Sequence, residues 1–123
     1  MPLIDTPALR LLGASLDVNA YRQTLISSNL ANVDTPGYRA QDIDFRKTLD
    51  NAVNAADVSY SLPLSPVAHK VQGLIERPDG NNVSADREAL LLAHTQLRFT
   101  LSAQLIKGEF HRILSAIKEG SGV

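Results

Sequence analysis

Apolar residues recur at helical spacing in the N-terminal part of the chain. They form one stripe with intervals of three and four residues, which the polar Asn19 and Gln23 interrupt: Leu9, Leu12, Leu16, Ile26, Leu30 and Val33. Such a stripe is typical of an amphipathic helix that buries one face. The interruption predicts a polar waist in the middle of that face.

The ends of this first helix can be placed from single residues. Thr6 is a good N-cap, and Pro7 suits the first helical position, where its missing N–H costs nothing. Pro36 disfavours the α conformation at Thr35. We therefore expect a long helix over residues 6–34.

The C-terminal part carries two neighbouring apolar stripes. One consists of Leu90, Leu97, Leu101 and Leu105. The other keeps a nearly unbroken heptad spacing: Leu92, Phe99, Ala103, Ile106, Phe110, Ile113 and Ile117. Ser84 can cap the helix that bears them, Asp86 and Glu88 favour its first turn, and Gly120 and Gly122 favour its end. The pattern predicts a helix over residues 85–118.

Two adjacent stripes make an apolar face that one antiparallel neighbour does not cover. We expect the N-terminal helix to shield the first stripe and other subunits to cover the second. The predicted subunit interface is Leu92, Phe99, Ile106, Phe110, Ile113 and Ile117. The alternative is a three-helix core in which a short helix near Phe45 fills the gap.

The middle of the chain, residues 35–84, is rich in turns. Pro36 and Gly37 suit the central positions of a type II turn. Phe45, Leu49, Ala52 and Val53 recur at helical spacing behind Asp42 and Asp44, either of which could cap a short helix.

Alternating residues predict two short strands at 58–62 and 71–75, joined across 63–70. A turn cluster follows at 79–82. The length favours one domain, 1–123. We predict a mainly α fold: an antiparallel coiled coil of the long N- and C-terminal helices, with a short turn-rich middle that contains a hairpin.

Composition narrows the function. Lys and Arg total 12 against 13 for Asp and Glu, so no long-range field favours nucleic acid or an anionic membrane. Cysteine is absent. The N-terminus lacks the basic and apolar regions of a signal peptide, and the longest apolar run, Ala89 to Ala93, is too short to span a bilayer. We expect neither a cleaved signal nor a transmembrane anchor.

Catalytic and metal-binding patterns are missing from the sequence. His69, His94 and His111 are too widely spaced for a local metal motif. Asp42 and Asp44 are expected to serve as a cap and as solvated charge. We therefore expect no catalytic, cofactor-binding or metal-binding residues, no small-molecule substrate and no enzymatic activity.

One stretch carries a specific resemblance. Residues 28–38, Ser-Asn-Leu-Ala-Asn-Val-Asp-Thr-Pro-Gly-Tyr, resemble the N-terminal signature of the flagellar axial proteins of rod and hook. Its positions here are Asn29, Ala31, Asn32, Asp34, Thr35, Pro36, Gly37 and Tyr38. Residues 39–45 and 79–83 are similar to the FlgB family of rod proteins, as is the short length, with FlgC as the nearest alternative. Residues 84–87 are less acidic than that family's pattern.

The resemblance implies a structural subunit of the proximal rod of the bacterial flagellar basal body, which transmits torque from the membrane ring to the distal rod. It also implies other FlgB copies, FlgC and FliE as partners, and a periplasmic location reached through the flagellar type III export channel. Ile43, Phe45 and Leu49 look like the apolar element that the export gate recognises, although packing of a short helix explains them equally well. The alternative function is a soluble helical adaptor or export chaperone that binds a partner helix.

Overall fold

The computed structural model describes residues 6–58 and 66–121. Within them it contains three helices and two short strands, in the order α1 (Pro7–Ala31), β1 (Gln41–Ile43), α2 (Phe45–Val58), β2 (Ala68–Lys70) and α3 (Ala85–Ser121). The predicted mainly α fold, with long terminal helices around a short middle, is confirmed.

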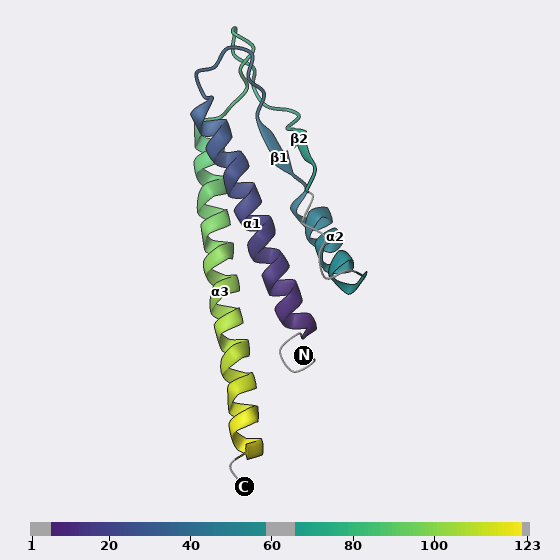
Figure 1. Cartoon of the computed structure of the whole chain (residues 1–123). Helices are drawn as coiled ribbons and strands as arrows, with labels where there is room; N and C mark the ends of the chain where they lie inside the picture. The colour runs from purple at the N-terminus through teal and green to yellow at the C-terminus, as the bar shows by residue number, and fades with distance from the viewer. Residues whose placement is uncertain (1–5, 59–65, 122–123) are drawn as a thin grey trace.

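The two long helices lie side by side and run antiparallel (Figure 1). At 1.5 Å per residue, α1 is about 37 Å long and α3 about 55 Å. The hydroxyl oxygens of Ser15 and Ser102 lie 3.2 Å apart and mark the register of the pair. Because α3 is the longer helix, it runs past the N-terminal end of α1.

Side-chain caps define the helix ends much as the sequence predicts. The Thr6 hydroxyl accepts a hydrogen bond from Leu9 N at 3.1 Å, and Pro7 is the first helical residue. At the start of α3, the Ser84 hydroxyl accepts one from Arg87 N at 3.2 Å. Asp44, rather than Asp42, caps α2 by accepting from Lys47 N at 3.1 Å. Each cap satisfies a backbone N–H that the helix leaves without a partner.

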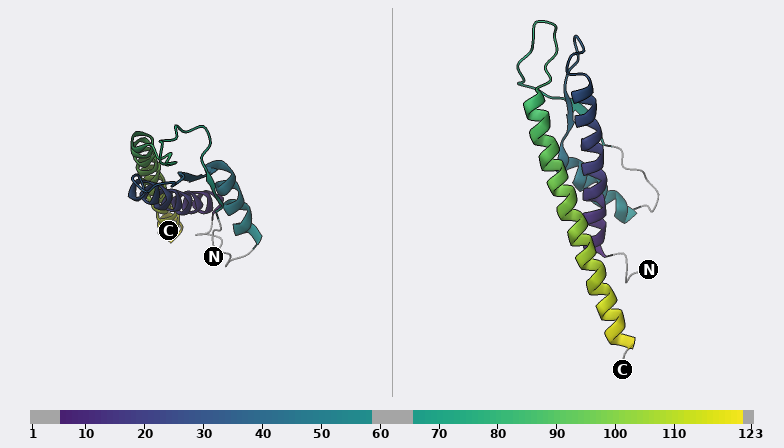
Figure 2. Two further views of the ribbon diagram at one scale, coloured as in Figure 1. Left: turned by 90° about the horizontal axis from the view of Figure 1, so that it is seen from above. Right: turned by 90° about the vertical axis from the view of Figure 1, so that its left-hand side faces the viewer.

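The hydrophobic core is small and lies where α1 meets α2 and the two strands. Val18, Leu25 and Ile43 are its buried centre, and four partly buried residues pack around them: Tyr21, Phe45, Leu49 and Ala68. They bring α2 and the two strands against α1, so that α1 lies between α2 and α3 (Figure 2). α2 reaches α3 through Arg98, whose guanidinium carbon lies 4.7 Å from the centre of the Phe45 ring.

The contact between α1 and α3 contains buried polar residues. Asn19, Thr95 and Ser102 are buried in it, and the Asn19 side-chain amide donates to the Ser15 hydroxyl at 3.4 Å. Of the two residues of the predicted polar waist, Asn19 is therefore buried, whereas Gln23 is exposed. Ile26, also fully buried, adds apolar contact to the same face of α1.

The middle contains a small antiparallel strand pair, as predicted, but the strands are elsewhere. β1 pairs with β2, with Gln41 opposite Lys70 and Ile43 opposite Ala68. The strand predicted at 58–62 is wrong at Val58, which ends α2, and its other residues lie outside the described ranges. The strand predicted at 71–75 is also wrong, because Gly73 has a φ of 80° and bends the chain there.

Candidate functional site

The signature residues form a tight turn where α1 ends. Tyr38 N donates to Thr35 O at 3.2 Å across Pro36 and Gly37. Gly37 has a φ of 76°, as the third position of a type II turn requires. Gly80, with a φ of 87°, packs against this turn so closely that a Cβ there would lie 3.4 Å from Gly37 Cα. Two glycines distant in sequence thus let two loops touch.

Asn81 is the centre of this contact and is fully buried. Its side-chain amide donates to Asn32 O at 2.9 Å and to Thr35 O at 2.8 Å. Its side-chain oxygen accepts from Val83 N at 2.8 Å. One side chain therefore binds the carboxyl end of α1 and the segment that enters α3.

Asn29 lies in the last turn of α1 and is also buried. Like Asn81, it binds backbone groups of another segment. Its amide donates to Gln41 O at 2.8 Å, and its oxygen accepts from Gln41 N at 3.0 Å and from the Tyr38 hydroxyl at 3.1 Å. Asn82 adds a contact to the neighbouring residue, because its side-chain oxygen accepts from Ala40 N at 2.7 Å. Three asparagines thus satisfy backbone groups of other segments.

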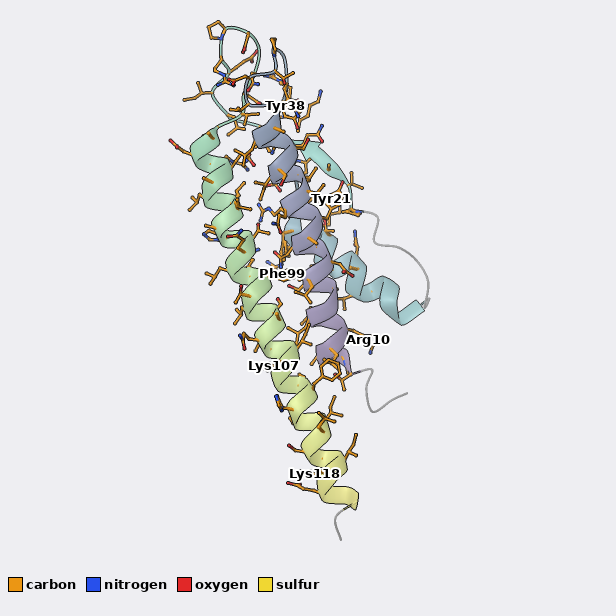
Figure 3. The ribbon with its side chains drawn as sticks, turned by 60° about the vertical axis from the view of Figure 1, so that its left-hand side comes forward. Arg10, Tyr21, Tyr38, Phe99, Lys107 and Lys118 are labelled. Atoms are coloured by element: carbon orange, nitrogen blue, oxygen red, sulfur yellow. The ribbon has the colours of Figure 1, made fainter. Side chains whose placement is uncertain are left out.

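We call this assembly the signature clasp: Asn29, Asn32, Thr35, Gly37 and Tyr38 with the loop 79–82. It lies at the end of the helix pair where α1 ends and α3 begins, as Tyr38 shows in Figure 3. Amide side chains at a helix end, such as those of Asn29 and Asn32, can cap free carbonyls or bridge to a neighbouring chain. In the structure both side chains bind groups of the same chain. Asn29 donates to Gln41 O, and Asn32 donates to Ser28 O at 2.8 Å.

A buried charge network lies next to the clasp. The Arg22 guanidinium binds both carboxylate oxygens of Asp42, at 3.0 and 2.8 Å. Arg87 lies 3.5 Å from the same carboxylate and donates to Glu88 at 3.0 Å. Two cations thus balance two anions across α1, β1 and α3, and the network joins all three elements.

Glu88 is the most constrained member of the network. Its side chain is fully buried, and one carboxylate oxygen has no partner within the described residues. Burial raises the pKa of Glu88 above its ordinary value, and the nearby Asp42 charge acts in the same direction, against Asn29 and Arg87. The folded state therefore favours a protonated Glu88 more than the unfolded chain does.

The two apolar stripes of α3 are not covered as the sequence suggests. Leu90, Leu97 and Leu101 are 62%, 69% and 57% exposed, so the expected shielding of this stripe by α1 is wrong. α1 instead lies over the side of α3 that carries the buried polar residues Glu88, Thr95 and Ser102.

The six residues of the predicted subunit interface fall into two groups that differ in exposure. Leu92, Ile106 and Ile113 are half-buried. Phe99, Phe110 and Ile117 remain 44%, 45% and 48% exposed.

Known proteins match the chain along nearly its whole length. A family model described as "Flagella basal body rod protein" matches residues 16–39. The flagellar basal body rod protein FlgB of Yersinia enterocolitica is 31% identical, over 92% of this chain and 95% of that protein. FlgB of Escherichia coli K12 is 31% identical over 93% of this chain, and FlgB of Bacillus subtilis 26% over 80%.

The chain belongs to the FlgB family. It is a structural subunit of the flagellar basal body rod. The adaptor or chaperone alternative is not favoured. The family match at 16–39 covers the second half of α1 and the signature turn, so the α1 side of the clasp lies in the segment that identifies the family.

Sequence reasoning missed the loop side of this FlgB clasp. It marked residues 79–82 as a turn but did not assign Asn81 and Asn82 to the end of α1, more than 40 residues earlier. The one available signal was a pair of asparagines in a turn followed by a helix cap. The sequence also gave no sign of the charge network, because no local pattern links Arg22, Arg87 and Glu88.

The residues predicted for export recognition are part of the core in the folded protein. Ile43 is buried, and Phe45 and Leu49 are half-buried against α1. An export gate could therefore contact all three only in an unfolded chain.

Other predicted features can be placed directly. His69, His94 and His111 are exposed. Among residues 6–58 and 66–121, no three His, Cys, Asp or Glu side chains gather as a metal site would require. In the same residues, no helix has both the length and the apolar character needed to cross a bilayer.

Proposed function

We propose that this rod protein occupies the proximal rod, in the periplasm, and transmits torque mechanically from the membrane ring to the distal rod. Its partners there are further copies of itself, FlgC and FliE. The FlgB proteins of Yersinia enterocolitica and Escherichia coli support this proposal, because each matches more than 90% of the chain. The role requires stiff elements joined end to end and no catalytic group.

The exposed apolar residues of α3 are the observation that carries the proposal. Phe99, Phe110 and Ile117 are nearly half exposed in a chain whose buried core is small. Burial of apolar surface stabilises by about 25 cal/mol per Å². We propose that neighbouring subunits cover these residues, together with the edges of Leu92, Ile106 and Ile113, as the predicted interface requires.

The test replaces Phe110 with alanine. In the isolated chain Phe110 is already half in water, so Phe110→Ala changes monomer stability little. At an interface the same change costs about 2–3 kcal/mol per contact. We expect normal secretion of the variant and few or no assembled rods, measured together in a strain that lacks its own copy.

Ile75→Ala is the matched control. Ile75 is more exposed than Phe110 and lies in the loop before α3, away from the proposed interface. This variant should assemble normally. Normal rods from Phe110→Ala, or an equal loss from both variants, would contradict the interface.

We propose further that the chain leaves the cytoplasm unfolded, through the flagellar type III export channel. Ile43, Phe45 and Leu49 would be read by the export gate before they enter the core. Phe45→Ser should then reduce secretion.

Because Phe45 also packs in the fold, a second variant separates the two effects. Val18→Ser damages the same core from α1, where no export element is proposed. Secretion reduced by Phe45→Ser and retained by Val18→Ser supports export recognition. Equal secretion of the two variants would rule it out.

A further inference from the structure

The face of α3 turned away from α1 carries a regular stripe. Its members recur at alternating intervals of four and three residues, and all are exposed: Leu90, His94, Leu97, Leu101, Gln104 and Gly108. We call this the outer α3 stripe. Leu97 and Gln104 lie two positions beyond Thr95 and Ser102, which are buried on the α1-facing side, and therefore about 200° around the helix from them. Nothing in the described part of the chain covers its leucines.

α1 carries a stripe of the same spacing on its own outward face. Its members are small or polar: Gly13, Asp17, Ala20, Thr24, Ser27 and Ala31. We call this the outer α1 stripe. All are exposed except Gly13, which is intermediate. The two stripes have equal length and the same order of intervals, but one is bulky and the other is not.

One antiparallel register aligns the two stripes member by member. With Gly13 opposite Gly108, Leu101 lies opposite Ala20, and Leu97 opposite Thr24. In the same register Leu90 faces Ala31, while the polar Asp17 and Ser27 face the polar Gln104 and His94. Large side chains meet small ones, and polar residues meet polar ones.

The same contact accounts for two glycines inside the helices. A Cβ added at Gly13 or at Gly108 would meet nothing within 4 Å, so the fold of the single chain does not require glycine at either position. Each costs about 1 kcal/mol relative to alanine in a helix. Both lie in the outer stripes and opposite each other, where the absence of side chains lets two backbones approach closely.

We propose that the outer α3 stripe of one copy docks against the outer α1 stripe of the next copy. The inference rests on the proposed assembly from several copies and adds the contact and its register. Because the two stripes are different surfaces, the contact is heterologous and repeats from copy to copy, which builds an open array instead of a closed dimer.

The register also sets the offset between copies. Within one chain Ser15 is opposite Ser102, whereas the proposed contact shifts α3 along α1 by about four residues, or about 6 Å. Two helices in contact over this length bury less than the roughly 1,600 Å² of a standard interface. A single contact is therefore weak, and the predicted interface around Phe110 supplies the remainder.

Disulfide trapping tests the register, since the chain has no cysteine of its own. Thr24→Cys and Leu97→Cys variants are produced together in a strain without its own copy, and its rods are oxidised. We expect a disulfide-linked heterodimer. The control pairs Thr24→Cys with Leu90→Cys, which lies about 10 Å out of register, beyond the roughly 7 Å between Cα atoms that a disulfide tolerates. The in-register pair should give about tenfold more heterodimer.

A charge substitution provides a second measurement. Leu97→Asp places a carboxylate in the proposed contact, whereas Leu114→Asp alters a similarly exposed leucine of α3 off the stripe. Both should leave the helix content of the single chain unchanged. We expect Leu97→Asp to lower rod assembly by about tenfold or more relative to Leu114→Asp.

The outcomes separate this contact from the function on which it rests. Rods that form normally, but give equal trapping for both cysteine pairs or equal assembly of both aspartate variants, overturn the docking register and leave the rod function intact. If the unaltered gene fails to restore rods in the same strain, the proposed function itself fails.

Discussion

Replacing Asn81 with alanine should loosen the clasp more than any other single change in its loop. The side chain is fully buried and makes three hydrogen bonds, two to carbonyls at the end of α1 and one from Val83 N. A hydrogen bond contributes about 0.5–1.5 kcal/mol net. Asn32 and Thr35 lie near the surface, so water can rehydrate their carbonyls, but Val83 is buried and its N–H loses its partner. We expect a loss of about 2–3 kcal/mol.

Urea unfolding followed by circular dichroism measures this loss, and hydrogen exchange at the Val83 amide locates it. Asn51→Ala, in an exposed part of α2, is the matched control and should change stability by less than about 0.5 kcal/mol. If Asn81→Ala leaves both the free energy of unfolding and the exchange rate of the Val83 amide unchanged, the hydrogen bonds of Asn81 do not hold the two loops together.

Four further substitutions test other features of the structure, each by urea unfolding. Because burial raises the folded pKa of Glu88, the native protein holds an extra proton between the ordinary and the raised value, so stability falls as pH rises through that window. Glu88→Gln should remove this fall, and an unaltered pH profile would contradict the assignment. Arg22→Ala leaves Asp42 with its longer contact to Arg87 and with the Ile43 N–H that donates to it at 2.8 Å, and should cost about 2–3 kcal/mol, less than for a fully buried pair; a loss below about 0.5 kcal/mol would show the pair to be unimportant. Gly37→Ala should cost about 1–2 kcal/mol at its positive φ, whereas Gly13→Ala should stabilise the monomer by about 1 kcal/mol; equal effects would contradict the turn geometry.

The parts of the fold that were predictable depend on neighbours in sequence. Thr6 caps α1 and Ser84 caps α3 because an N-cap bonds an N–H only a few residues away. The Pro36–Gly37 turn is equally local, since proline restricts one φ and glycine accepts the next. The family signature was recognisable for the same reason, because its residues are contiguous.

The strands were misplaced because their pairing is not local. β1 has only three residues and lies before α2, while its partner β2 follows a segment of more than 20 residues. Alternation at 71–75 resembled a strand, but nothing in that alternation reports Gly73 or the distant residues 41–43. The hydrogen bonds of Asn81 were hidden in the same way, since a turn of asparagines does not reveal which carbonyls it binds.

The choice of face on α3 follows from a different physical cause. An apolar pattern alone predicts that α1 covers leucines, yet α1 brings Ser15, Asn19 and Asn29 to the contact, and these polar groups require polar partners once they are buried. Ser102 supplies a hydroxyl to Ser15 across this contact, and Thr95 and Glu88 are buried polar residues of α3, while the leucine stripe remains outside. The buried polar residues and the exposed leucines therefore belong to one arrangement, in which α3 turns polar positions toward α1 and leaves its leucine stripe outside.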